Sequence, residues 1–466
     1  MRVLLALADA NGAVLNREDL IESCWDGLVV GDDAINRTIA ELRRIGRATG
    51  AGFIIETVPR VGYRLVRAAS DREAVAGSAP GSRFSGRRRL LLGIPAVLVT
   101  GAAILLNPRR PANAQAAALR LRGEQALRDE LPDSMEQGIG FLREAAALEE
   151  DARGAGLLAL ALRNAAEHGP ESKTAAAVNA CEAAVRQALS LDPKEPNALA
   201  ARATLLPAYG DWAAAEHRLR DVLAVAPNHP YSLSALGYLM ESVGRSRLSA
   251  QLTARAAELE PLSPVFQYRL AYKLWILGRV READQVIDRA MQLWPRHPAV
   301  NFARLLLFVW TARYEPALAF LSNAGQGGAI MPPPAAALWR LSIGALESRD
   351  PATVEQARTA QLDAARESAG SAVMAIQVLS LLSATDAAFA VADGYLLRRG
   401  AVIGSLGTSP TRMTVNDQRW RKTAMLFVPS TAALRKDNRF GALVQAIGLA
   451  DYWRSRVVSP DYQLGA

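Results

Sequence analysis

The hexapeptide LDPKEP at residues 191–196 sets the pattern for most of this 466-residue chain, because three related hexapeptides follow it at intervals of 34 residues. They are VAPNHP at 225–230, LEPLSP at 259–264 and LWPRHP at 293–298. Each contains two prolines three residues apart, and proline cannot continue a helix but is tolerated in a helix's first turn. The spacing predicts a series of helical units, with a proline loop between one unit and the next.

The segments between the proline loops repeat at the same interval. A glycine recurs inside three of the units, at Gly210, Gly244 and Gly278. Small residues, which let paired helices approach closely, recur in one register at Cys181, Ala215, Ser249, Ala283 and Ala317. This period and pattern resemble the tetratricopeptide repeat, a helix–turn–helix unit of 34 residues. The resemblance implies an α-solenoid over residues 112–330, with residues 331–466 as a helical extension of the array.

A solenoid of this kind has a concave face that is lined by the first helix of each unit. In this register, we expect those helices to begin near Asn197, Tyr231, Val265 and Ala299. Three polar or aromatic residues on these helices are our candidates for contact with a partner, which is either a protein or a small molecule: Arg202, Tyr238 and Lys273. The alternative is that these residues form a solvated face.

An uncharged run of seventeen residues, 90–106, is bracketed by three arginines at 87–89 and by Arg109 and Arg110. A helix of that length rises about 25 Å, slightly short of a ~30 Å hydrocarbon core, and flanking arginines can reach the headgroups. We therefore expect one transmembrane helix over 90–106, after a linker at 68–89; a buried core helix is the alternative. The arginine balance favours a cytoplasmic N-terminus and periplasmic repeats, in a single-pass protein of a bacterial inner membrane.

The first 67 residues mix helical and strand patterns. Three apolar residues fall at i, i+4 and i+7, which is the spacing of one helix face: Ile35, Ile39 and Leu42. The segment 17–25 predicts a shorter helix before them. The runs FIIETV at 53–58 and YRLV at 63–66 flank a PRVG turn and predict a β-hairpin, with Tyr63 in the core.

Two linked motifs in this segment, VVGDDAINRTIAELRR at 29–44 and IETVPRVGYRL at 55–65, resemble the OmpR-type winged helix of transcription regulators. The likeness is closest to the membrane-bound CadC/ToxR-like branch. In that family the second motif helix enters the major groove of double-stranded DNA, and the hairpin wing touches the minor groove or the backbone. Relatives carry a small N-terminal sheet before the first helix, whereas this chain opens inside that helix. Either the true start lies upstream of Met1, or the head is minimal.

The residues allow the same assignment independently, because the polar side of the second helix remains available to DNA. Asparagine can pair with adenine, arginine with guanine or phosphate, and the small Ala40 permits close approach to base edges. Arg60 at the wing tip is placed to reach a phosphate or a narrow minor groove. The predicted DNA-binding residues are Asn36, Arg37, Thr38, Ala40, Glu41, Arg43, Arg44 and Arg60. The alternative is a solvated helix face.

The sequence contains no catalytic constellation, so we expect neither an enzyme nor a cofactor. The four histidines lack the spacing of metal ligands, and we expect His229 and His297 to be ordinary solvated loop residues. The two cysteines cannot form a disulfide framework. The net charge of +8 suits a partner that carries phosphates.

We therefore predict a mostly α-helical, membrane-anchored, one-component transcription regulator. It consists of a winged helix at 1–67 that lacks the N-terminal sheet, one transmembrane helix, and a C-terminal α-solenoid of tetratricopeptide-like repeats. It binds promoter DNA, with a homodimer on the DNA left open, and it senses a protein or small molecule through extracytoplasmic repeats. The alternative is a membrane-anchored tetratricopeptide scaffold for protein–protein interaction with a vestigial DNA-binding head.

Overall fold

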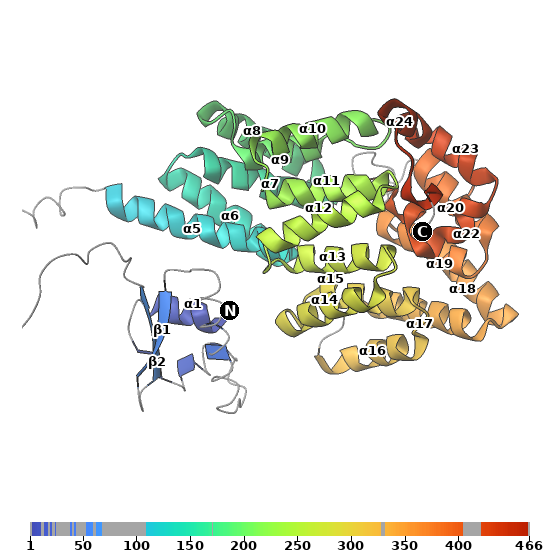
Figure 1. The fold of residues 1–466 in the computed structure, drawn as a ribbon, viewed down its shortest axis with the longest axis horizontal. Helices are drawn as coiled ribbons and strands as arrows, with labels where there is room; N and C mark the ends of the chain where they lie inside the picture. Colours follow the sequence, from blue (N-terminus) through green and yellow to red (C-terminus); the bar gives the residue numbers. More distant parts are fainter. Residues whose placement is uncertain are drawn as a thin grey trace, which may run out of the picture. The chain divides into compact units, whose positions relative to one another are not determined.

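The computed structural model divides the chain into two compact units, Met1–Pro95 and Ala96–Ala466, which are treated separately below (Figure 1). The structure describes residues 2–10, 14–16, 19–20, 24, 38–39, 42, 53–58, 62–67, 109–169, 171–327, 331–403 and 421–464. The expected linker at 68–89 and the apolar run at 90–106 lie outside these residues. The finer domain boundaries stay predictions.

In the N-terminal unit, helix α1 (Arg2–Asp9) packs with a two-stranded antiparallel sheet. Strand β1 (Phe53–Val58) pairs with strand β2 (Gly62–Arg67), and Glu56 stands opposite Arg64. This is the predicted hairpin, so that prediction is confirmed. The buried core consists of Val3, Leu7, Leu20, Cys24, Ile39, Leu42, Ile55 and Tyr63. The predicted inward positions Ile39, Leu42 and Tyr63 are therefore confirmed, whereas Ile35 lies outside the described residues.

The sequence did not reveal a third extended segment beside β2. The backbone N–H of Leu15 donates to the carbonyl of Tyr63 at 3.0 Å, and the N–H of Tyr63 donates back to Leu15 at 2.9 Å. A Cβ atom added at Gly62 would lie 1.9 Å from the carbonyl oxygen of Leu15. Only glycine permits this approach, so the glycine of the predicted turn has a packing role at the start of β2.

The predicted transmembrane helix is wrong. None of the helices in the described part of the chain combines the length and the apolar character that crossing a lipid bilayer requires. The fold class is corrected to a mostly helical chain with a small two-stranded sheet and a tetratricopeptide-like solenoid. The predicted single-pass inner-membrane localisation with periplasmic repeats is wrong for the same reason.

The C-terminal unit is a solenoid of helix pairs. Two pairs precede the first proline loop, α5 (Arg109–Asp129) with α6 (Pro132–Leu148) and α7 (Ala152–His168) with α8 (Glu171–Leu191). The first pair of the 34-residue register follows, α9 (Pro196–Leu205) with α10 (Trp212–Val225). The central pairs are α11 (Pro230–Ser242) with α12 (Ser246–Leu259), α13 (Pro264–Ile276) with α14 (Val280–Leu293), and α15 (Pro298–Trp310) with α16 (Tyr314–Gly327). Two further pairs follow, α17 (Pro333–Ser348) with α18 (Pro351–Ala364) and α19 (Ala369–Leu381) with α20 (Thr385–Leu397).

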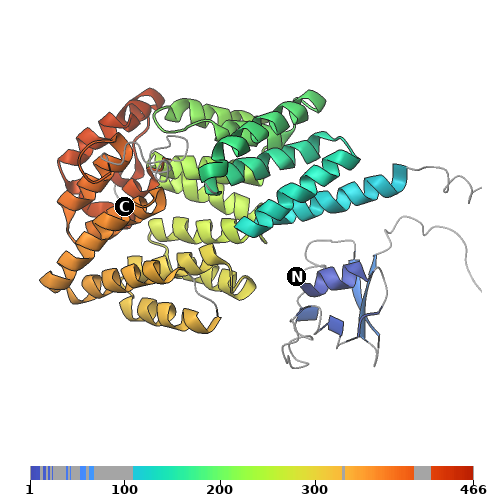
Figure 2. The same ribbon diagram turned by 180° about the vertical axis from the view of Figure 1, so that it is seen from behind.

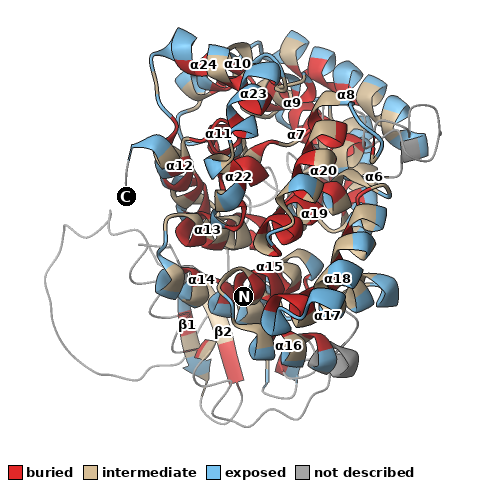
Figure 3. Ribbon diagram, turned by 90° about the vertical axis from the view of Figure 1, so that its right-hand side faces the viewer, coloured by how far each residue is buried: buried red, intermediate tan, exposed pale blue. Residues whose placement is uncertain are grey.

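The second proline of each loop begins a helix, as the sequence predicted. Pro196, Pro230, Pro264 and Pro298 are the first residues of α9, α11, α13 and α15. The small residues of the predicted register are all buried where the helices meet, with 3% or less of their surface exposed: Cys181, Ala215, Ser249, Ala283 and Ala317. Figure 2 shows the pairs stacked one on the next from behind, and Figure 3 shows that buried residues concentrate on their inward sides.

A residue in the left-handed backbone region stands two positions before the second helix of most pairs. Three of these residues are the predicted turn glycines, Gly210, Gly244 and Gly278, with φ of 85°, 79° and 76°. The others are not glycines: Glu130, Ala312, Arg349 and Ser383, with φ of 48°, 56°, 56° and 61°. The same turn therefore continues through residues 331–403, where the sequence shows no clean period.

The prediction that His229 and His297 are solvated loop residues is wrong. Both are buried, with 9% and 7% of their surface exposed. Each is the N-cap of a helix, and its Nδ1 accepts a backbone N–H, from Ser232 at 3.3 Å and from Val300 at 3.4 Å. Glu195 and Ser263 occupy the same position before α9 and α13 and cap those helices in the same way. The imidazoles replace the usual oxygen acceptors of a cap.

The solenoid ends in a segment of short helices that packs back onto the central pairs (Figure 1). It comprises η4 (Ala424–Phe427), η5 (Pro429–Thr431), α22 (Ala432–Lys436), α23 (Arg439–Ala446), α24 (Leu449–Arg456) and η6 (Asp461–Gln463). We call residues 421–464 the closing segment. Its backbone N–H at Asp461 donates to the carbonyl of Gly244 at 2.8 Å, and the Trp453 indole donates to the carbonyl of Val243 at 2.8 Å. The turn between α11 and α12 thus anchors the C-terminal end of the chain.

We predict that Gly244→Ala destabilises the solenoid more than Gly278→Ala does. Both glycines have positive φ, so either alanine costs about 1–2 kcal/mol of backbone strain. A Cβ at Gly244 would also meet Pro460 at 2.9 Å and Phe427 at 3.0 Å, whereas nothing lies within 4 Å at Gly278. The overpacking should add about 1–3 kcal/mol. Urea unfolding of the full chain, followed by far-ultraviolet circular dichroism, measures both variants.

Ala312→Gly is the matched change in the opposite direction, because Ala312 already has a φ of 56°. Glycine relieves that strain, so this variant should unfold at a higher urea concentration than the parent. If the two glycine variants lose the same amount of stability, the closing segment does not pack against the α11–α12 turn.

We also predict an acid-dependent loss of stability that traces to His229. Burial lowers the pKa of His229 from 6.5 to about 4 in the folded chain. Between these values the unfolded chain binds a proton that the native chain does not, so stability is full above about pH 6.5 and falls towards pH 4. The loss amounts to about 3 kcal/mol. His229→Asn keeps a cap acceptor without titrating in this range and should flatten the unfolding free energy over it.

His217→Asn is the control, because the His217 side chain is 74% exposed beside Asp221. A parent-like pH profile in the His229 variant would contradict the assignment, and so would an equal flattening in the His217 variant.

Candidate functional site

The structure describes one of the eight predicted DNA-binding residues, Thr38. Thr38 is helical and half-buried, next to the buried Ile39. The other seven lie outside the described residues: Asn36, Arg37, Ala40, Glu41, Arg43, Arg44 and Arg60. The assignment of these side chains to DNA therefore stays a prediction.

The described residues establish the scaffold on which such a surface would depend. Ile39 and Leu42 are 2% and 5% exposed, so one side of this helical segment faces the core. Ile55 of β1 and Tyr63 of β2 belong to the same buried cluster. The two strands are further joined by an ion pair between Arg64 and Glu56, at 2.7 Å. A helix and a hairpin thus share one small core, which is the arrangement of a winged helix.

The C-terminal unit contains a cavity of about 970 Å³ on the inner side of the solenoid. Most of its lining comes from the first helices of successive pairs, α7, α9, α11, α13, α15, α17 and α19, and α5, α10 and α18 add to it. The four first helices that the sequence predicted, α9, α11, α13 and α15, all contribute to this lining. The closing segment completes the wall with residues 421–428. The volume is within the range of sites for small molecules, about 300–1,000 Å³.

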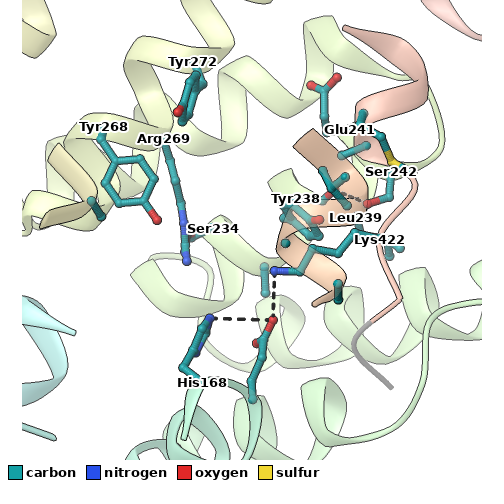
Figure 4. A pocket seen from close by; sticks show the side chains of 18 of the residues that line it. His168, Ser234, Tyr238, Leu239, Glu241, Ser242, Tyr268, Arg269, Tyr272 and Lys422 are labelled. Atoms are coloured by element: carbon teal, nitrogen blue, oxygen red, sulfur yellow. Dashed lines mark hydrogen bonds and ion pairs between the residues drawn. The ribbon is translucent and has the colours of Figure 1, made fainter. Parts of the chain in front are cut away.

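One wall of the cavity carries a carboxylate that is shared by several cationic groups. Glu167 of α7 lies 2.6 Å from Arg163 and 3.4 Å from Lys422 of the closing segment. His168 lies 3.9 Å from the same carboxylate, as Figure 4 shows for His168 and Lys422. Burial alone would raise the pKa of Glu167, but Arg163 and Lys422 outweigh it and hold the pKa well below its usual range. Glu167 is therefore an anion at neutral pH.

Tyr238 of α11 lies beside Lys422 in the same view (Figure 4). The ammonium of Lys422 is 5.9 Å from the centre of the Tyr238 ring, and that of Lys273 is 5.8 Å from it. Tyr238 keeps 37% of its surface accessible, and this surface opens into the cavity. Burial raises the pKa of the Tyr238 hydroxyl, so the phenol stays protonated and can donate a hydrogen bond.

Further paired charges line the cavity near Tyr238. Arg269 of α13 donates to the Ser234 hydroxyl at 3.1 Å and lies 3.6 Å from Glu130. Lys273 lies 3.5 Å from Glu241, and only 8% of its side chain is exposed. Burial lowers the pKa of Lys273, and Glu241 beside it offsets part of this effect. The cavity therefore combines charged groups with an otherwise apolar lining.

Two of the three residues that the sequence singled out on the concave helices line the cavity, namely Tyr238 and Lys273. Arg202 is exposed and does not line it. Sequence reasoning missed Glu167, Arg269 and Lys422. The signal for Arg269 was available, because it lies one helical turn before Lys273 on the same first helix. No comparable signal marks Glu167 or Lys422, since α7 and the closing segment lie outside the 34-residue register.

The arrangement can bind a guest molecule. Within residues that the structure describes, no group of three His, Cys, Asp or Glu side chains could hold a metal ion. Both cysteines are buried, and burial raises the pKa of the Cys181 thiol to about 11, which keeps it an unreactive thiol. The cavity offers hydrogen-bond donors, aromatic faces and charges to a guest molecule.

Comparison with known families shows that residues 1–65 match the family described as "Transcriptional regulatory protein, C terminal". A comparison with curated proteins found no match. Solved structures similar to the helical region include Pseudomonas aeruginosa PilF, at 16% identity over 48% of this chain and 96% of that one, with a TM-score of 0.32. A tetratricopeptide repeat protein from Parabacteroides merdae is also 16% identical, over 53% and 91% of the two chains, with a TM-score of 0.33. Yeast Tom70 is 15% identical over 71% and 67%, with a TM-score of 0.36.

The two parts of the chain are thus assigned on separate grounds. The solenoid assignment rests on the 34-residue register and the helix pairs, because likenesses at these TM-scores add nothing to it. The head is assigned by the family match together with the shared core of helix and hairpin. Residues 1–65 match the DNA-binding domain family of the OmpR-type winged-helix regulators, and the helical region is a tetratricopeptide-like solenoid.

Proposed function

We propose that the chain is a one-component transcription regulator, which binds promoter DNA through its winged helix and receives a signal through its solenoid. The observation that carries the proposal is the match of residues 1–65 to the regulator DNA-binding family. The matched family is one of DNA-binding domains and not of enzymes, and we propose no catalytic activity. The net charge of +8 adds a general attraction to phosphates.

The proposed DNA contacts are those that the sequence predicts. Asn36 would read an adenine in the major groove, while Arg44 and Arg60 would contact phosphates on either side. Contacts of the first kind determine which sequence is bound, and contacts of the second kind determine how tightly any sequence is bound. The two kinds therefore have different signatures, which an experiment can separate.

The signal would act in the solenoid, where a cavity of about 970 Å³ has the character of a ligand site. A ligand can shift a conformational equilibrium only by its difference in affinity for the two states. Head dimerisation on DNA is one equilibrium that such a signal could bias. A protein partner on the outer faces of the solenoid is the other form that the signal could take.

We predict that three head variants separate into two classes. Asn36→Ala should relax discrimination at one base position by about 1–3 kcal/mol. Arg44→Ala and Arg60→Ala should each weaken binding to all sequences and reduce the slope of log affinity against log salt by about one. Binding sites would be selected from a random double-stranded pool with the full chain, and affinities measured by fluorescence anisotropy.

Arg289→Ala is the matched control, because Arg289 is an exposed arginine of α14 in the solenoid. It should leave both sequence preference and salt slope unchanged. If the head variants bind the selected sequences as the parent does, the groove assignment is wrong. If the parent itself selects no sequence, an interaction scaffold with a vestigial head becomes the better explanation.

A further inference from the structure

The cavity of the solenoid is covered by parts of the chain that do not belong to the central repeats. At one side the closing segment lies along α11, where Thr423 donates its hydroxyl hydrogen to the carbonyl of Ser242 at 2.7 Å. At another side the last turn of α5 reaches α13 and α15, and His297 contacts the carbonyl of Asp129 at 2.7 Å. The chain thus occupies part of its own concave face and leaves a hollow of about 970 Å³.

Because parts of the chain already cover the concave face, only a molecule of limited size fits the cavity. An extended peptide or a helix of a partner protein needs a continuous groove, and residues 421–428 already fill part of the concave side. The remaining hollow matches the volume of sites that enclose small organic molecules. The structure therefore favours a small molecule over a protein in this cavity.

The walls define the body of such a molecule. Most of the lining is apolar, and aromatic rings are frequent in it, among them Tyr238, Phe266, Phe302, Trp310 and Trp339. Two of these rings, Phe302 and Trp339, pack edge to face at 5.9 Å. Rigid aromatic walls bind apolar and aromatic bodies at a low cost in side-chain entropy.

The charges define the polar end of the molecule. The described lining contains five side chains that carry a positive charge, Arg163, Arg269, Lys273, Arg421 and Lys422. It contains three carboxylates, Glu130, Glu167 and Glu241. His168 adds no charge at neutral pH, because burial lowers its pKa. The lining therefore has an excess of positive charge.

The best-placed group for an added anion is Lys422. Its side chain is 40% exposed and faces the cavity beside Tyr238, which offers a protonated phenol. Its neighbour Glu167 is already 2.6 Å from Arg163, so this carboxylate divides its charge between two cations. An anionic group that accepted hydrogen bonds from Lys422 and Tyr238 would offset part of the excess positive charge.

We propose that the cavity binds a small organic anion with an aromatic or otherwise apolar body, whose anionic group lies beside Lys422 and Tyr238. This proposal rests on the proposed function in one respect, since it identifies the class of signal that the solenoid receives. The binding site itself is a property of the solenoid alone.

A matched pair of fluorescent probes tests the proposal on the full chain. 8-Anilinonaphthalene-1-sulfonate has an apolar aromatic body and a sulfonate, and N-phenyl-1-naphthylamine has the same body without the charge. The sulfonate probe should bind with a stoichiometry of one and more tightly than the neutral probe. Lys422→Met should weaken the sulfonate probe by about tenfold, because a charged hydrogen bond is lost, and should leave the neutral probe unchanged.

Two further variants make the test specific. Glu167→Gln removes a negative charge from the lining, so it should strengthen binding of the sulfonate probe by several-fold. Lys194→Met makes the same chemical change as Lys422→Met at an exposed lysine outside the cavity, and it should change neither probe. Retained binding of the neutral probe in every variant shows that the cavity is still formed.

Equal affinity for the two probes in the parent would overturn the proposal, because the cavity would then not select an anion. Loss of both probes together in Lys422→Met would overturn the role of the charge. The measurement is made without DNA, so a failure of promoter binding leaves it intact. The probes could also bind in the predicted order without changing the affinity of the chain for DNA. That result would support the binding site and contradict its link to the proposed function.

Discussion

The structure of the solenoid depends on the fact that a helix pair cannot bury both of its apolar faces by itself. Each pair covers those faces only by stacking on its neighbours. The left-handed residue two positions before the second helix fixes the turn, so that successive pairs stack in the same way. Once the pairs are stacked, the first helices form one continuous inner wall. The cavity is a consequence of that wall and of the segments that cover it.

This dependence explains which parts of the fold could be predicted. The proline and glycine register predicted the starts of α9, α11, α13 and α15 to within a residue, because those residue types have few alternative backbone conformations. The turns at Ala312, Arg349 and Ser383 were not predicted, because a residue other than glycine does not indicate a positive φ in the sequence. The histidine caps were misjudged because an imidazole is an uncommon acceptor at that position. The transmembrane helix was inferred from an uncharged run between arginines, whereas none of the helices that the structure describes has the length and apolar character to cross a membrane.

The sequence predicted the two candidate sites to different extents. In the head, spacing alone predicted that Ile39 and Leu42 lie in the core, and they do. The DNA contacts assigned to the opposite face stay a prediction. In the cavity, the residues that face one another come from distant parts of the chain. Glu167 and Lys422 are separated by 255 positions in sequence and share no register, so no local pattern could bring them together. Only the stacking of the intervening pairs does so.

Lys422 connects the cavity to the closing segment. Lys422 belongs to the closing segment and Glu167 to α7, so their contact joins two parts of the cavity wall. An anion beside Lys422 competes with Glu167 for the same ammonium group and therefore alters that contact. A tenfold preference of the anion for one arrangement is worth about 1.4 kcal/mol. Since a hydrogen bond to a charged group contributes about 1.5–3 kcal/mol, a ligand of modest selectivity can change how firmly the closing segment is held.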